Sequence, residues 1–159
     1  MAVKSPEDIP WHVQTFQDVD MALIFGDAWM VACSHFASSL IPPSELTPFS
    51  ALAVSLWILS ATVRGDYTSY RRVSEEGSFL VGWTVYIGIL QACFSWLFFT
   101  PAHLCVLAFL VSHGMVDPSP VIHIEMGSRV SPILEVDVAM LVTMTTWRAF
   151  YYMIQERLI

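Results

Sequence analysis

Positive charge is scarce in this chain. Its 159 residues include seven Lys and Arg against 14 Asp and Glu, which gives a formal net charge of −7. Binding to nucleic acid requires clustered cations that neutralise phosphates. We therefore expect no nucleic-acid partner.

Cysteine is also scarce. Cys33, Cys93 and Cys105 lie in apolar stretches, without the CxxC or Cys/His spacing of a zinc finger. This pattern argues against a disulfide framework and against a zinc site built on cysteines. We expect small buried thiols instead.

The common catalytic motifs are missing. The chain has no GxSxG, HExxH, Walker A or GxGxxG sequence, and no nucleophile stands beside a base in a recognisable pattern. The sequence therefore predicts a protein that is not an enzyme.

Apolar residues are abundant. They make up 55% of the chain while charged residues make up 13%, about half the roughly 25% of an average soluble domain. This composition indicates a protein that lies in a lipid bilayer. We expect one all-α domain, a four-helix transmembrane bundle with spans at about 19–41, 48–64, 78–99 and 132–154.

Prolines mark the expected ends of these spans. Pro42 and Pro43 should end the first, Thr47 and Pro48 should cap and open the second, and Pro101 should end the third. The run 102–113 then remains as a short extra helix. Its 12 residues would measure about 18 Å against a hydrocarbon core of about 30 Å, so we expect it to be interfacial or re-entrant.

The segment before the first span, residues 1–18, is polar and contains two prolines. We interpret it as a surface arm, in which Trp11 and Phe16 could dock on a partner or on lipid headgroups. A poorly fixed terminus is the alternative.

The distribution of cations favours four spans over five. With four, one side of the membrane holds Lys4, Arg64, Arg71, Arg72, Arg148 and Arg157, and only Arg129 lies opposite.

This topology places Asp27 about 12 Å and Arg148 about 9 Å from the same face. Charges at such depth usually pair within the bundle, so we predict an ion pair between Asp27 and Arg148. It could latch the helices together or serve as a proton or ion relay; alternatively, Arg148 extends to the interface and Asp27 is protonated.

A second polar group is expected near the opposite face. His35 lies toward the end of the first span, His103 and His113 bracket the short helix, and Glu135 and Asp137 open the last span. The three histidines are candidate ligands of a metal, a haem or a chlorophyll magnesium. Ten residues separate His103 from His113, which is not the spacing of a helical metal pair, so structural histidines are the alternative. His35 is the best single candidate because it lies within an apolar span.

Three stretches resemble a known family. They are LIFGDAWMVACSHF, TPFSALAVSLWILSATVRGDY and TTWRAF, and together they resemble the helix motifs of the family called domain of unknown function 3054. One departure is that Gly88 lacks the arginine that usually follows a glycine in the family's third helix. The resemblance implies a four-helix membrane protein of bacteria or plastids with no established activity. Its motif positions are Asp27, Ser34, His35, Pro48, Phe49, Trp57, Tyr67, Trp147 and Arg148.

These features favour an accessory subunit of a larger membrane complex. We expect a photosystem-type assembly, with chlorophyll and carotenoid as cofactors and with lipid and other membrane subunits as partners, because aromatic residues make up 13% of the chain. The plastid branch of the resemblance implies the thylakoid or the envelope membrane of a chloroplast. One alternative is a small carrier or ion-conducting protein that uses Asp27 and Arg148. Another is a membrane enzyme with a metal or haem at His35, His103 and His113.

Overall fold

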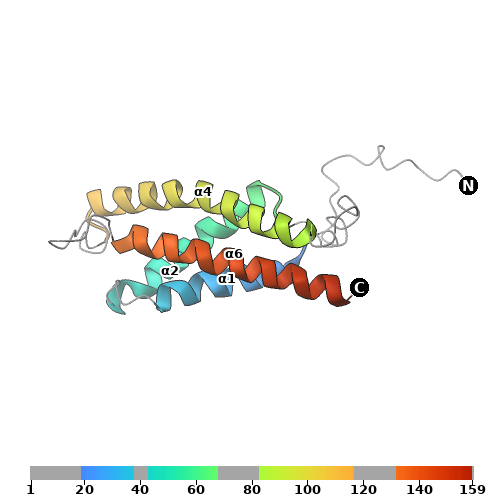
Figure 1. Cartoon of the computed structure of the whole chain (residues 1–159). Coiled ribbons are helices and arrows are strands. Elements are labelled where there is room, and N and C mark those ends of the chain that lie inside the picture. Colours follow the sequence, from blue (N-terminus) through green and yellow to red (C-terminus); the bar gives the residue numbers. More distant parts are fainter. Residues whose placement is uncertain (1–18, 38–42, 68–82, 117–131, 159) are drawn as a thin grey trace, which may run out of the picture.

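The computed structural model describes residues 19–37, 43–67, 83–116 and 132–158, and these residues form an all-α bundle. Its helices are α1 (Met21–Phe36), α2 (Pro43–Val63), α4 (Trp83–Ser112) and α6 (Pro132–Leu158). Figure 1 shows α6 lying between α1 and α4, with the C-terminal end of the chain beside the start of α4. The predicted docking residues Trp11 and Phe16 lie outside the described residues.

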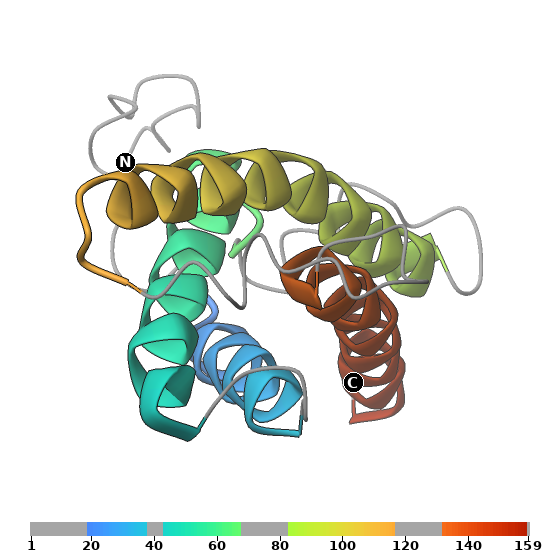
Figure 2. The same ribbon diagram turned by 90° about the vertical axis from the view of Figure 1, so that its left-hand side faces the viewer.

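The four helices pack in a ring. Close contacts join α1 to α2, α2 to α4, α4 to α6 and α6 back to α1, and the end-on view in Figure 2 shows the same order. Successive helices run in opposite directions. As a result the start of α1, the end of α2 and the end of α6 meet at one end of the bundle, where the backbone N–H of Asp20 donates to the carbonyl of Tyr67 (2.9 Å).

Three apolar clusters fill the bundle from end to end. The middle cluster is built around Trp57, Phe99 and Met144. The cluster at the end just described contains Leu23, Ala61, Tyr67, Tyr151 and Tyr152, and the cluster at the opposite end contains Phe49, Leu107, Ile133 and Val136.

Two glycines allow aromatic rings to lie directly against helix backbones. A Cβ at Gly26 would collide with the indole of Trp147, and a Cβ at Gly88 would collide with the ring of Tyr152. Both aromatic residues belong to α6. Glycine at these positions therefore lets α6 approach α1 and α4 closely, as small residues do in helix packing.

The structure corrects the prediction that Pro101 separates two helices. Residues 102–112 continue α4 without a break, so no separate interfacial or re-entrant helix forms within 83–116. Proline removes only one backbone donor, and contacts on both sides of it hold the helix in place. Before it, the Trp96 indole donates to the carbonyl of Asp137 (2.7 Å); after it, His103 bonds the Asp137 carboxylate. Figure 2 shows α4 curving over the bundle, as a helix with an internal proline commonly does.

The expected start of the second helix was also wrong. Instead of beginning at Pro48, α2 begins at Pro43 and includes Pro48. Since proline suits the first turn of a helix, Pro43 can open α2. The first helix ends at Phe36, and the rest of the predicted first span, 38–41, lies outside the described residues.

Within the described part of the chain, one helix is long and apolar enough to cross a membrane. This helix is α4, Trp83–Ser112, while Met21–Phe36 and Pro48–Val63 are shorter apolar helices. Its 30 residues correspond to about 45 Å. The structure thus contains the four helices of the expected bundle, one of which has the size of a membrane span.

Candidate functional site

A charge cluster in the interior of the bundle is organised around Asp27. Its carboxylate is fully buried on α1 and accepts hydrogen bonds from two tryptophan indoles and one phenol. The donors are Trp57 (3.0 Å), Tyr67 (3.1 Å) and Trp147 (3.0 Å). Trp57 and Tyr67 bond Oδ2, whereas Trp147 bonds Oδ1. Three segments distant in sequence therefore converge on one carboxylate.

Arg148 forms an ion pair with this carboxylate. Its Nη2 lies 2.5 Å and its Nε 3.2 Å from Asp27 Oδ2, and both side chains are fully buried. The guanidinium carbon also lies 5.9 Å from the ring centre of Trp57 and 5.6 Å from that of Tyr67, within the range of cation–π attraction. The structure thus brings together the two residues for which the sequence predicts an ion pair.

A second carboxylate lies beyond the guanidinium. Asp66 Oδ2 is 3.7 Å from Arg148 Nη1, accepts a 2.5 Å hydrogen bond from Ser95 and lies 3.4 Å from Nε of Arg64. Two arginines therefore balance two aspartates, so this interior cluster carries no net charge when all four groups are ionised.

An outer layer of contacts ties the cluster to the end of the bundle. Asp20 caps α1 by accepting from the backbone N–H of Leu23 (3.0 Å), and it also accepts from the hydroxyl of Tyr151 on α6 (2.6 Å). A carboxylate at a helix N-terminus interacts favourably with the helix dipole. Asp20 therefore fixes both the start of α1 and its position beside α6.

The hydrogen bonds that the Asp27 carboxylate already accepts limit its possible chemistry. Both of its oxygens accept hydrogen bonds from buried or half-buried donors, so its charge is neutralised within the fold. Burial together with the Asp27 charge raises the pKa of Tyr67 above its usual range, and the phenol therefore remains a proton donor. Each oxygen of Asp27 therefore already accepts at least one hydrogen bond from the protein.

Sequence reasoning gave no site role to several members of this cluster. Tyr67 and Asp66 follow the end of α2, and their exposed fractions are only 5% and 3%. Sequence reasoning noted Trp57, Tyr67 and Trp147 only as motif positions of the resemblance. One signal was available: an acid within an apolar run needs several donors, and tryptophan is the largest apolar residue that carries one.

The structure divides the predicted ligand histidines into two groups. His35 and His103 are fully buried, and their rings lie 6.1 Å apart, edge to face. His103 Nδ1 is 3.1 Å from both oxygens of Asp137. Potential metal-binding atoms of His35, His103 and Asp137 all lie within 4.8 Å of one another.

His113 does not join this group. It is exposed at the end of α4, where its Nδ1 lies 2.8 Å from the carbonyl of Phe109 and its ring lies 4.1 Å from the ring of Phe109. Glu135 is exposed too. Of the five polar residues expected near this face, three are therefore brought together and two are not.

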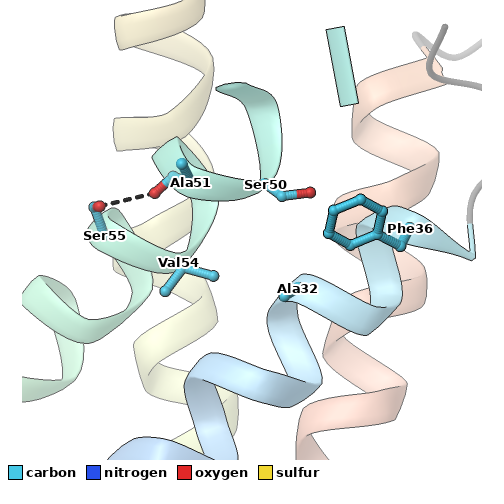
Figure 3. Close-up of a pocket in the computed structure, with 6 residues that line it drawn as sticks. All are labelled: Ala32, Phe36, Ser50, Ala51, Val54 and Ser55. Atoms are coloured by element: carbon cyan, nitrogen blue, oxygen red, sulfur yellow. Dashed lines mark hydrogen bonds between the residues drawn. The ribbon is translucent and has the colours of Figure 1, made fainter. Parts of the chain in front are cut away.

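A shallow apolar groove of about 380 Å³ lies between α1 and α2. Figure 3 shows the side chains of Phe36 and Ser50 directed toward it, with Ser55 bonded to the backbone of its own helix. Its polar lining is limited to serine hydroxyls. The groove is lined by Ala32, Phe36, Ser50, Ala51, Val54 and Ser55.

Comparisons with models of known families, with curated proteins and with solved structures find no match to this chain. The resemblance to the family called domain of unknown function 3054 therefore stays a prediction. What the chain does has to be inferred from its own geometry.

Proposed function

We propose that this protein is an integral membrane accessory subunit, a four-helix bundle that stabilises a larger membrane complex. One observation carries the proposal: charged groups are buried inside the bundle while large apolar side chains are exposed on its outer faces. Asp27, Arg148, Asp137, His35 and His103 have no exposed surface. The outward faces of the same helices carry large apolar side chains, among them Trp29 (70% exposed), Phe25 (68%), Val142 (64%), Phe98 (60%) and Leu59 (58%).

The physical argument rests on the cost of each surface in water and in lipid. Large contiguous apolar surfaces are unusual on soluble monomers and mark contact with a membrane or with another protein. Charged groups within spans, in turn, usually face the bundle interior and pair there. Both halves of this pattern occur here: the buried polar groups belong to α1, α4 and α6, and exposed apolar side chains occur on all four helices.

In this proposal the Asp27–Arg148 pair is a structural latch. It joins α1 to α6, the first and last helices of the ring, and Trp57 and Tyr67 add the end of α2. The saturation of Asp27 favours this role over that of an ion carrier, since a transported ion or proton would have to displace donors that are all engaged. The latch requires no enzymatic activity.

The photosynthetic setting rests on the sequence: aromatic residues make up 13% of the chain, and the plastid branch of the resemblance implies a thylakoid or envelope membrane. Chlorophyll and carotenoid are the cofactors in this proposal. A chlorophyll magnesium binds an accessible imidazole nitrogen, and His35 and His103 are fully enclosed by protein. These two histidines therefore do not fit the role of chlorophyll ligand.

Membrane extraction and native electrophoresis test the proposal. The full chain should stay with membranes through an alkaline carbonate wash, dissolve in mild detergent and migrate in a complex much larger than one chain. Replacing both Trp11 and Phe16 with Ala should reduce the amount in the complex and leave membrane insertion unchanged. Release by carbonate, or migration only as a pigment-free monomer, would contradict the proposal.

A further inference from the structure

The end of the bundle opposite the charge cluster contains buried polar atoms without partners. Among the described residues, five buried side-chain atoms lack a hydrogen-bond partner, and four belong to this end: His35 Nε2, His103 Nε2, Ser50 Oγ and Thr100 Oγ1. Buried polar groups are normally satisfied, because each unpaired group costs about 1–3 kcal/mol. Several such atoms at one end indicate a function there other than packing.

The hydrogen bonds of His35 determine which of its nitrogens is free. Its Nδ1 lies 3.0 Å from the carbonyl oxygen of Val31. Because a carbonyl can only accept, Nδ1 carries the proton and donates it. Nε2 therefore holds a lone pair that no described group uses, which is the state in which imidazole binds a metal.

His103 and Asp137 provide the other two donors. The Asp137 carboxylate lies 3.1 Å from His103 Nδ1, and the His103–Asp137 contact joins α4 to α6, while His35 comes from α1. Each of the three side chains is fully buried. A cluster contributed by three helices is held by the bundle as a whole and not by one flexible loop.

We propose that His35, His103 and Asp137 bind a divalent transition-metal ion of the zinc class. The ion takes His35 Nε2, one ring nitrogen of His103 and the Asp137 carboxylate. Two imidazoles and one carboxylate suit zinc and its neighbours, whereas magnesium and calcium prefer oxygen ligands. Three protein ligands leave one coordination position open.

The distances fit this assignment with small adjustments. The three ligand atoms lie within 4.8 Å of one another. Tetrahedral zinc with bonds of about 2.0–2.1 Å places its ligand atoms about 3.4 Å apart. The largest separation therefore has to shorten by about 1.4 Å for tetrahedral coordination.

The groove between α1 and α2 reaches the neighbourhood of this site. Two of its lining residues, Ala32 and Phe36, flank His35 on α1, and Ser50, whose hydroxyl has no partner, lines it from α2 (Figure 3). His35 itself is fully buried and does not line the groove. The metal site goes beyond the accessory-subunit role and does not depend on it.

Metal binding to the full chain in detergent tests the proposal. After removal of metals with a chelator, the wild-type protein should bind one Zn²⁺ per chain by calorimetry and elemental analysis. It should also develop the visible absorption of tetrahedral Co²⁺. His35→Gln and His103→Gln should each weaken Zn²⁺ binding by about 100-fold, and Asp137→Asn by about 10-fold or more.

His113→Gln is the matched control. This histidine is exposed and lies outside the cluster, so its replacement should leave both the stoichiometry and the affinity unchanged. Helical circular dichroism verifies that each variant folds, and Zn²⁺ should raise the Tm of the wild-type protein and of His113→Gln alone. If the variants at His35 and His103 fail to fold, the Co²⁺ spectrum of the wild-type protein still decides the question.

Three results would overturn the inference. One is no stoichiometric Zn²⁺ or Co²⁺ binding by the folded wild-type protein. A second is unchanged affinity in folded His35→Gln and His103→Gln. A third is the loss of binding in His113→Gln, which would place the ion at the surface. None of these results bears on membrane insertion or on complex formation, so the accessory-subunit role is tested separately.

Discussion

Buried polar groups are hydrogen-bonded to different extents at the two ends of the bundle. Around Asp27, both carboxylate oxygens are engaged by donors from α1's neighbours. Around His35 and His103, ring nitrogens and nearby hydroxyls are buried without partners. One atom of the latch, Arg148 Nη1, also lacks a hydrogen-bond partner, although it lies 3.7 Å from Asp66 Oδ2. Hydrogen-bonded buried groups hold the fold together, whereas each unpaired buried group costs stability that a bound ligand would restore. The contrast separates a structural latch from a ligand site within one small bundle.

Breaking the latch should have the largest effect. Arg148→Met leaves the Asp27 charge buried without its guanidinium, and we expect a loss of about 3–5 kcal/mol in the free energy of unfolding. Denaturant unfolding in detergent, followed by circular dichroism, measures it. The double variant with Asp27→Asn should lose less than the sum of the two single variants; strict additivity would argue that the two groups do not act as a pair.

A single indole donor should be worth less than the guanidinium. Trp57→Phe removes one hydrogen bond to the buried carboxylate, and we expect a loss of about 2 kcal/mol. Trp29→Phe makes the same chemical change on the exposed face of α1 and should alter stability by less than about 0.5 kcal/mol. Equal effects in the two variants would mean that the bond to Asp27 is not what makes Trp57 important.

The phenol of Tyr67 connects the latch to pH. Its raised pKa means that the folded state favours the neutral phenol, so this contribution to stability is fully present below the unfolded-state pKa of about 10 and declines as pH rises above it. Tyr67→Phe should cost about 1 kcal/mol at pH 7.

The same variant should also make the loss of stability above pH 10 less steep. Tm measured across the alkaline range tests this, with Tyr86→Phe on the outer face of α4 as the control. An unchanged alkaline slope in Tyr67→Phe would show that another group titrates there.

The smallest effect, of opposite sign, is expected near the unsatisfied end. Thr100→Val replaces a buried hydroxyl without a partner by an apolar group of the same shape, so stability should stay the same or rise by up to about 1 kcal/mol. Ser95→Ala, five residues earlier on α4, removes the donor to Asp66 and should destabilise the protein by about 1 kcal/mol or more. If both variants destabilise equally, the distinction between the two ends is lost.

Part of this site could be predicted from sequence because depth along a helix follows from residue count. Asp27 and Arg148 are level once the topology is assumed, and an isolated charge within an apolar helix needs a partner. The same counting predicted that His35, His103 and Asp137 lie near one face. Residue counting could not distinguish these three residues from His113 and Glu135. It gives the depth of a residue along the helix axis but not whether its side chain faces the interior.

The errors at Pro101 and Pro48 have a related cause. A proline removes one backbone bond from a helix, and the local pattern alone favours a break. In α4 this preference is overruled by the bonds of Trp96 and His103 to Asp137, a residue 34 or more positions away in sequence. Local rules therefore misplaced a helix boundary that a distant contact decides.

By itself, the sequence determined the all-helical class, the number of packed helices and the need for a buried partner to Asp27. The length of each apolar run and the presence of a charge within it can be read directly from the sequence. The tertiary structure alone decided which donors surround that carboxylate, that Asp66 faces the same guanidinium, and that two histidines meet an aspartate in the interior. These depend on the rotation of each helix about its axis, and the packing of all four helices together sets that rotation.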